Sequence, residues 1–346
     1  MNITVSPQKV QKQPLRTELD HLVIDDQTRD RMAAQLRDLA NPYDDPRRFA
    51  AQIRPALSAL RIRDLQRIHD FATDPNSPAV MLIENLPTDP DLPPTPIDDS
   101  IVKSNRHFVG EAVAYGLGKL IGEPIGYTTE KDGDILHNLI PVKGAEATQS
   151  NRGSKTFLNF HNDCVYDKSG WYHTYNADFL VLYGHRPDPN LEAETMYIDA
   201  KTICALLSTE DLKELRKPQF EMASPSNFTL LLNKGQTVWS EPGPVISGPE
   251  NTPEISIAAN GTRGSTDRAQ EALQALLSIC DRPDHRISAR IKSGQTLLVN
   301  NRKGIHARSS FTPTFGPDER WLLRANVRRD TWSMRHRKTD EWNVYA

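Results

Sequence analysis

Residues 157–163 read FLNFHND, an apolar run that ends on a histidine and an aspartate two positions apart. In a β-strand, residues i and i+2 project to the same face, so the imidazole of His161 and the carboxylate of Asp163 can converge on one metal ion. A chain with ten histidines and 45 acidic residues is expected to contain such a pair by chance. The pair therefore indicates a metal site only if other elements support it.

A second apolar run leads to another histidine. Residues 297–308 read LLVNNRKGIHAR, which predicts a buried strand, a turn and then His306. Two histidines and one carboxylate on one face of a metal ion leave three positions open, which suits Fe(II) that must bind a chelating co-substrate and O₂ together. The spacing alone leaves a second interpretation open, in which one of the two histidines is packed and the other lies in a surface loop.

Two arginines lie in the next apolar run. Residues 320–324 read RWLLR, and in a strand Arg320 and Arg324 share a face because their spacing is even. An arginine fork binds a carboxylate through two parallel hydrogen bonds, so two inward arginines indicate two carboxylates or one dianion in the same pocket. The alternative is an exposed edge of a sheet that carries two solvated arginines.

Composition excludes several classes of protein. The 346 residues include 42 Lys and Arg and 45 Asp and Glu, and this net charge of −3 argues against a broad nucleic-acid or anionic-membrane surface. No apolar stretch approaches the roughly 18 residues that cross a bilayer. The N-terminal residues lack the apolar region of a secretory signal, so we predict a cytoplasmic protein. The expected partner is a small-molecule substrate. The three cysteines, Cys164, Cys204 and Cys280, fit no zinc or redox pattern, and no disulfide is expected.

The apolar pattern changes along the chain. Residues 15–72 carry apolar positions at helical spacing, including Leu19, Leu22 and Val23, and the Asn41-Pro42 and Arg54-Pro55 pairs predict breaks between short helices. From residue 126 onwards, short apolar runs alternate with Gly, Pro, Asn and Asp, which is typical of β-strands. The candidate strands are 135–140, 156–160, 179–183, 195–198, 228–232, 255–259, 295–300 and 321–327, with helical insertions near 200–216 and 266–279.

This alternation predicts a mainly β protein with flanking helices, built as a barrel or a double-sheet jelly roll. No change of composition marks a domain boundary, so we expect one domain over residues 1–346. Within it we expect an N-terminal helical flank at 1–78 and a β core at 79–330.

Four separated motifs together resemble a known family. They are FLNFHND, DFLVLYGHRPD with ETMYIDA after it, VNNRKGIHARSSF and ERWLLRANV. The sequence is similar here to the Fe(II)/2-oxoglutarate oxygenases of the clavaminate synthase-like group, which includes arginine, asparagine and lysine hydroxylases. The match extends upstream to GEPIGYTTEKDGDILHNLIP and covers residues 105–330. The resemblance implies a double-stranded β-helix core, a requirement for Fe(II), 2-oxoglutarate and O₂, and release of succinate and CO₂.

The resemblance also implies roles for particular residues. The implied iron ligands are His161, Asp163 and His306; the 2-oxoglutarate ligands are Arg320 and Thr195; and the substrate-pocket residues are Arg324, His137 and Ser154. Many relatives have glutamate where Asp163 stands, and the shorter arm shifts the metal relative to the strand. Any carboxylate at this position counts against halogenation, which in related enzymes goes with a small residue.

A second departure concerns the substrate. Relatives that take arginine place acidic residues on the segment at 255–263, which here offers Ala, Asn and Arg. Arginine is therefore disfavoured as the substrate, whereas lysine stays open because Asp167 can supply the countercharge.

These features predict an enzyme that hydroxylates C3 or C4 of a free L-amino acid or a similar metabolite. The same chemistry can instead give desaturation, cyclisation or epimerisation of an amino-acid-derived, carrier-bound or peptide substrate. A non-catalytic jelly-roll protein that binds a ligand or a metal is the alternative from another class.

Overall fold

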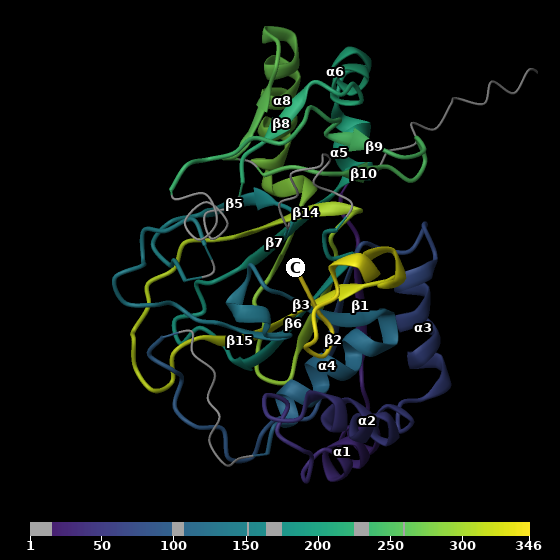
Figure 1. The fold of residues 1–346 in the computed structure, drawn as a ribbon, viewed down its shortest axis with the longest axis vertical. Coiled ribbons are helices and arrows are strands. Elements are labelled where there is room, and N and C mark those ends of the chain that lie inside the picture. Colours follow the sequence, from purple (N-terminus) through teal and green to yellow (C-terminus); the bar gives the residue numbers. More distant parts are fainter. Residues whose placement is uncertain (1–15, 99–106, 151, 164–174, 225–234, 259) are drawn as a thin grey trace, which may run out of the picture.

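Two β-sheets form the centre of the molecule, and helices lie outside both of them (Figure 1). The computed structural model describes residues 16–98, 107–150, 152–163, 175–224, 235–258 and 260–346. Among these residues no helix has the length and hydropathy needed to cross a bilayer.

The larger sheet has the order β1-β2-β13-β6-β15-β3-β16, and β4 also pairs with β15. Its central strands are antiparallel, whereas β1 and β16 add to it in parallel. The strands are β1 (Leu19–Val23), β2 (Val80–Glu84), β3 (Glu123–Tyr127), β4 (Leu136–Leu139), β6 (Phe179–Arg186), β13 (Thr296–Asn300), β15 (Trp321–Arg328) and β16 (Val344–Tyr345).

The smaller sheet is antiparallel and has the order β12-β7-β14-β5. Its strands are β12 (Ile287–Ala289), β7 (Thr195–Asp199), β14 (Gly304–Arg308) and β5 (Leu158–His161). Two short strand pairs accompany it, β8 (Phe220–Met222) with β11 (Thr262–Gly264) and β9 (Ile246–Ser247) with β10 (Glu254–Ile255).

The two sheets face each other across an apolar layer. Alternate residues of a strand point to opposite faces, so each sheet supplies one set of side chains to this layer and another set to the helices outside. The shared layer contains Leu180, Leu182, Leu297 and Val299 from the larger sheet and Tyr197, Ile287 and Ala289 from the smaller one. This arrangement confirms the predicted double-sheet, mainly β architecture.

Helices cover the outer face of each sheet. α4 (Val109–Ile121) packs between the larger sheet and the N-terminal helices, which explains why almost all of its residues are buried. The N-terminal helices are α1 (Asp26–Gln35), α2 (Pro46–Leu57) and α3 (Ile62–Thr73). The smaller sheet is covered by α5 (Ala200–Leu206), α6 (Thr209–Leu215) and α8 (Asp267–Cys280), and the 3-10 helices are η1 (Lys131–Gly133), η2 (Pro283–His285) and η3 (Trp332–Arg337).

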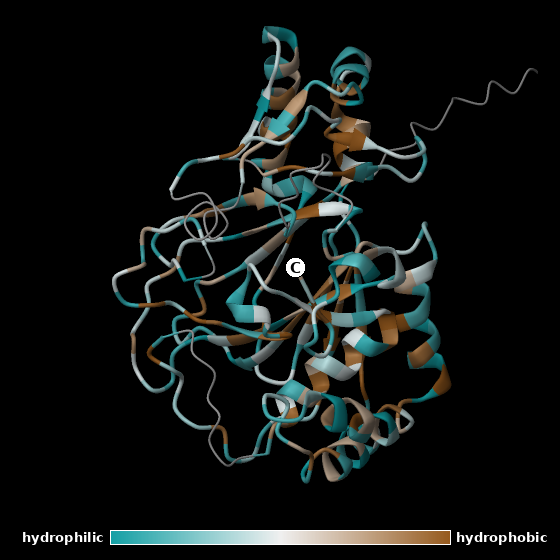
Figure 2. Ribbon diagram, in the orientation of Figure 1, coloured by the Kyte–Doolittle hydropathy of each residue, from teal (hydrophilic) through white to brown (hydrophobic). Residues whose placement is uncertain are grey.

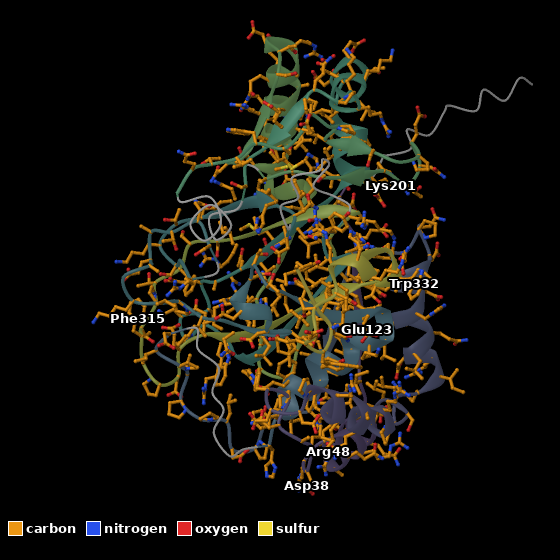
Figure 3. The ribbon with its side chains drawn as sticks, in the orientation of Figure 1. Asp38, Arg48, Glu123, Lys201, Phe315 and Trp332 are labelled. Atoms are coloured by element: carbon orange, nitrogen blue, oxygen red, sulfur yellow. The ribbon has the colours of Figure 1, made fainter. Side chains whose placement is uncertain are left out.

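The helices on the two sides lie at opposite ends of the molecule. Asp38 and Arg48 mark the end formed by α1 and α2, and Lys201 lies towards the end formed by α5, α6 and α8 (Figure 3). Brown and teal segments alternate along α3 (Figure 2), as expected of a helix that buries one face. The smaller sheet lies between the two groups of helices.

Several predictions of secondary structure were wrong. Residues 19–23, expected in a helix, form β1, which pairs in parallel with β2 and buries Leu22. Pro55 does not itself end a helix but lies in the last turn of α2, which ends two residues later at Leu57. By contrast, His306 follows a buried strand and a turn as expected, and it lies inside β14.

Other expectations have mixed outcomes. Of the described residues at 255–258, Ile255 alone belongs to a named strand, at the end of β10. Residues 228–232 and 259 lie outside the described residues. The division into a flank at 1–78 and a core at 79–330 stays a prediction, although β1 joins the larger sheet from within the flank.

Candidate metal centre

Two histidines and one aspartate converge on the inner face of the smaller sheet. His161 on β5 lies directly opposite His306 on β14, and the ring centroids are 4.4 Å apart. Asp163 follows β5, and its Oδ1 lies 3.4 Å from Nε2 of His161 and 3.5 Å from Nε2 of His306. The three donor atoms lie within 4.8 Å of one another, so they can hold one metal ion.

The histidines are in a suitable form to bind a metal. Nδ1 of His161 donates to the backbone oxygen of Asn159 at 2.6 Å, which leaves the lone pair of Nε2 facing the centre. Burial, together with the nearby imidazole of His161, lowers the pKa of His306 and favours its neutral form. A neutral imidazole is the form that ligates metals.

The two oxygens of Asp163 face different partners. Oδ1 faces the imidazoles, whereas Oδ2 accepts a hydrogen bond of 2.7 Å from the guanidinium of Arg324. Burial alone would raise the pKa of Asp163, but Arg324 and the two histidines outweigh it and hold that pKa well below its usual range. The carboxylate is therefore an anion with one oxygen directed at the candidate metal position.

Arg324 lies at the centre of a buried polar cluster. It stands opposite His137 in the β15–β4 pair, donates to Nδ1 of His137 at 2.7 Å and forms an ion pair with Glu130. Nε2 of His137 donates to the backbone oxygen of Asp134, and burial lowers the pKa of His137 to about 4. A neutral His137 thus accepts from Arg324, while Asp163 and Glu130 supply two carboxylates to the same guanidinium.

Glu130 was missed by the sequence analysis. It lies between β3 and η1, inside the upstream part of the family match, and Asn326 donates to its Oε2 at 3.1 Å. The available signal was an acidic residue within GYTTEKDG. That segment contains two acids, Glu130 and Asp132, and no spacing rule selects one of them.

Arg320 carries a buried charge that forms no direct ion pair with any described carboxylate, although Asp188 and Glu319 act on it from further away. It lies just before β15 and is 7% exposed, yet its guanidinium makes no hydrogen bond or ion pair with any side chain in the part of the chain that the structure describes. Its Cζ lies 5.6 Å from the ring centroid of Phe311, and burial lowers its pKa to about 10. Because a buried cation is costly without a partner, this pocket favours an anionic ligand.

Arg308 is a second cation at this pocket that the sequence analysis missed. It follows His306 by two positions on β14, so the two side chains share a face. Its guanidinium donates to the backbone oxygens of Gly153 and Thr156 and lies 5.2 Å from Phe311. The even spacing from His306 was the available signal.

The remaining predicted residues have different outcomes. Thr195 is buried on β7 directly opposite Arg308, which places it on the face of the metal centre. Ser154 is fully buried, and its backbone oxygen accepts from the amide of Phe311 at 2.9 Å, so it lies on the Arg320 side of the centre rather than among the contacts of Arg324. Asp167 lies outside the described residues.

The segment at 255–263 runs beside the metal centre. Ala258 forms a β-bridge with His161, and Asn260 accepts a hydrogen bond of 2.6 Å from the side chain of Asn159. Arg263 points elsewhere, since it pairs with Glu221 at 2.8 Å. Thus the part of this segment that the structure describes offers the centre no acidic side chain.

Comparison with known proteins decides the family. A family model described as "Taurine catabolism dioxygenase TauD, TfdA family" matches residues 237–326, which include His306, Arg320 and Arg324. The L-asparagine oxygenase of Streptomyces coelicolor is 31% identical over 261 residues, which are 75% of this chain and 74% of that protein. The chain belongs to the TauD/clavaminate synthase superfamily. The L-lysine 3-hydroxylase of Catenulispora acidiphila, another similar protein, is 28% identical over 86% of this chain and 80% of its own.

A solved structure agrees with this membership of the superfamily. Asparagine oxygenase in complex with Fe(II), 2S,3S-3-hydroxyasparagine and succinate has a TM-score of 0.81 and 27% identity, and the match covers 94% of this chain and 98% of that one. This chain is therefore an Fe(II)/2-oxoglutarate-dependent oxygenase with a jelly-roll core, which confirms the predicted family, fold class and cofactors. The non-catalytic alternative is set aside. The two imidazoles and one carboxylate of the candidate centre form a donor set that suits Fe(II).

Proposed function

We propose that this enzyme hydroxylates C3 or C4 of a free L-amino acid, with conversion of 2-oxoglutarate to succinate and CO₂. The observation that carries the proposal is the pairing of Arg324 with Glu130 beside Asp163. A guanidinium and a carboxylate held side by side match the two charges of an α-amino acid, whose carboxylate and ammonium are one carbon apart. The names of the similar proteins, an asparagine oxygenase and lysine and ornithine/arginine hydroxylases, agree with this substrate class.

In this proposal His161, Asp163 and His306 hold the iron. Fe(II) bound there would activate O₂ together with 2-oxoglutarate, so that one oxygen atom of O₂ enters the C–H bond and the other enters succinate. The protein holds the three donors on the inner face of a sheet, with the carboxylate of Asp163 ionised and the imidazole of His306 neutral.

Arg320 and Thr195 bind the distal carboxylate of 2-oxoglutarate in this proposal. The carboxylate would give the buried guanidinium of Arg320 the direct ion pair that no described side chain forms with it. The hydroxyl of Thr195 lies on the same face as His306. Arg308 adds a second positive charge near Phe311, which favours a dicarboxylate over a monocarboxylate co-substrate.

The substitution Arg320→Lys is expected to raise the KM for 2-oxoglutarate by about tenfold, since a lysine keeps the charge but loses the bidentate fork. Steady-state succinate formation measures this effect. The KM for the amino acid should stay within about threefold, because Arg324 is unchanged. An unchanged KM for 2-oxoglutarate would show that its carboxylate is held by other residues.

Arg324 and Glu130 also explain the carbons that would react. Arg324 would bind the α-carboxylate of the amino acid, and Glu130 would bind its α-ammonium. Cα is then held next to the guanidinium that also bonds to Asp163. C3 and C4 are then the carbons next along the side chain towards the metal centre. An internal residue of a peptide or a carrier-bound thioester lacks the free α-carboxylate, so it would leave Arg324 without the group that replaces its present partners.

A panel of amino acids tests the proposal directly. We expect a product heavier by one oxygen atom from at least one free L-amino acid in the presence of Fe(II), ascorbate and 2-oxoglutarate, measured by mass spectrometry. Amino acids with neutral or amide side chains should react better than arginine, because the described part of residues 255–263 offers no countercharge.

Blocked forms of the reactive amino acid are the matched controls. Its N-acetyl and methyl ester derivatives each remove one charge and should react at least about tenfold more slowly. A product lighter by two hydrogen atoms would indicate desaturation instead. Equal turnover of the blocked derivatives would rule out recognition of the free amino acid.

A further inference from the structure

The loop that carries Asp163 is clamped by the side chain of Asn301. The backbone N–H of Asp163 donates to Oδ1 of Asn301 at 3.0 Å, and Nδ2 of Asn301 donates back to the backbone oxygen of Asp163 at 2.8 Å. The second N–H of that amide donates to the backbone oxygen of Ala177 at 2.9 Å. Both donors and the acceptor of the amide are therefore used, and two of the three bonds hold one residue.

Asn301 is itself held firmly. It is 3% exposed, lies in the turn between β13 and β14, and donates its backbone N–H to the oxygen of Asp178 at 2.9 Å. β14 carries His306 five positions further on. One buried amide thus connects the loop of the carboxylate donor with the strand of a histidine donor.

Asn162 braces the same loop from its other side. Its Nδ2 donates to the backbone oxygens of Asn301 and Gly304, and its Oδ1 accepts from the backbone of Ile257 at 2.9 Å. The backbone N–H of Asn162 donates to the oxygen of Ile257 at 3.0 Å. The chain before Asp163 therefore cannot shift without breaking bonds to two other segments.

We propose that Asn301 is a positioning residue for metal binding, which fixes the backbone of Asp163 so that Oδ1 faces His161 and His306 and Oδ2 faces Arg324. The inference rests on the proposed role of Asp163 as an iron ligand. An aspartate has one side-chain torsion fewer than a glutamate, so its carboxylate follows any movement of its backbone more closely. The clamp therefore matters more here than it would for the longer glutamate arm.

Removal of the clamp has a defined consequence. Asn301→Ala leaves the N–H and C=O of the partly buried Asp163 without these bonds, so its backbone relaxes and the carboxylate leaves its position between the imidazoles. Loss of a group that orients a metal ligand typically costs about 10–100-fold in metal affinity. We expect a loss of this size for Asn301→Ala.

The neighbouring Asn300 offers a matched control. It is also a buried asparagine at the start of the same turn, but its Oδ1 accepts from the backbone of Arg302 and Lys303 and makes no contact with Asp163. Asn300→Ala should lower the thermal midpoint about as much as Asn301→Ala, yet leave metal affinity within about threefold of the wild type. The pair separates positioning of the ligand from general stability.

The experiment is an anaerobic titration of the metal-free protein with Co(II), followed by the visible bands of the bound ion. The inference is supported if Asn301→Ala binds at least about tenfold more weakly than both the wild type and Asn300→Ala. It is overturned if Asn301→Ala matches the wild type, or if Asn300→Ala weakens binding equally. A wild-type protein that binds no Co(II), together with a His306→Ala variant that behaves identically, would instead refute the proposed metal centre itself.

A near-isosteric variant covers the case in which Asn301→Ala does not fold. Asn301→Asp keeps an oxygen that accepts from the N–H of Asp163 but has no N–H to return to its carbonyl. We expect weaker Co(II) binding by at least about tenfold, with a circular dichroism spectrum like that of the wild type. Unchanged Co(II) affinity in this variant would also overturn the inference.

Discussion

Replacing His306 with alanine is expected to abolish succinate formation and to remove most of the bound iron. His306 is a nearly buried donor on β14 and stands directly opposite His161, so no neighbouring side chain of the described sheet can take its place. Removal of a group that only orients a ligand costs about 10–100-fold, and loss of the ligand itself should exceed that range. Metal content and succinate formation, measured on the same preparation, check both effects.

His69 provides the control for this substitution. It is an exposed histidine on α3, outside both sheets. His69→Ala should keep the metal content and the activity of the wild type. If His306→Ala retained stoichiometric iron and turnover, the candidate centre would have been placed wrongly.

Local patterns predicted the parts of the site that lie close together along the chain, at the end of β5 and at the start of β15. The i and i+2 rule brings His161 and Asp163 together, because both residues belong to the same short segment at the end of β5. The even spacing of Arg320 and Arg324 identified two buried arginines in the same way. Such rules need only residues that are close together along the chain.

Contacts between segments could not be derived from these rules. The register that sets His306 against His161 depends on how β5 and β14 pair, which is decided by the packing of the whole sheet. For the same reason the sequence did not show that Arg324 bonds to Asp163, or that Glu130 reaches Arg324 from a loop. The clamp by Asn301 joins residues 138 positions apart and leaves no trace in local spacing.

The N-terminal error has a similar origin. Leu19, Leu22 and Val23 fit a helical spacing, but five residues before the Asp25 cap of α1 are too few for a stable helix of their own. Parallel pairing with β2 satisfies their backbone groups instead. Short apolar runs are ambiguous in sequence, and the neighbour that is available in the fold decides their conformation.

Replacing Arg324 with methionine is expected to lower kcat/KM for the amino acid by about a thousandfold. Its guanidinium bonds to Asp163 and His137 and pairs with Glu130, so the variant loses the proposed carboxylate ligand and leaves two carboxylates without their cation. Loss of one partner of a buried, hydrogen-bonded charge pair costs about 2–5 kcal/mol, and about 4 kcal/mol corresponds to this factor. The kcat/KM of Arg324→Lys should lie between those of Arg324→Met and the wild type, because a lysine keeps the positive charge but cannot form two parallel hydrogen bonds.

Two measurements separate a role in substrate binding from a loss of stability. The KM for 2-oxoglutarate should stay within about threefold in the Arg324 variants, since Arg320 belongs to a separate pocket. Arg328→Lys changes another buried arginine on the same face of β15, one that bonds to Asn176 and not to the metal centre, and should lower the thermal midpoint without the loss in kcat/KM. If Arg324→Met kept the kcat/KM of the wild type, the amino acid would not be held by this guanidinium. The pairing of Arg324 with Glu130 would then play no part in substrate binding.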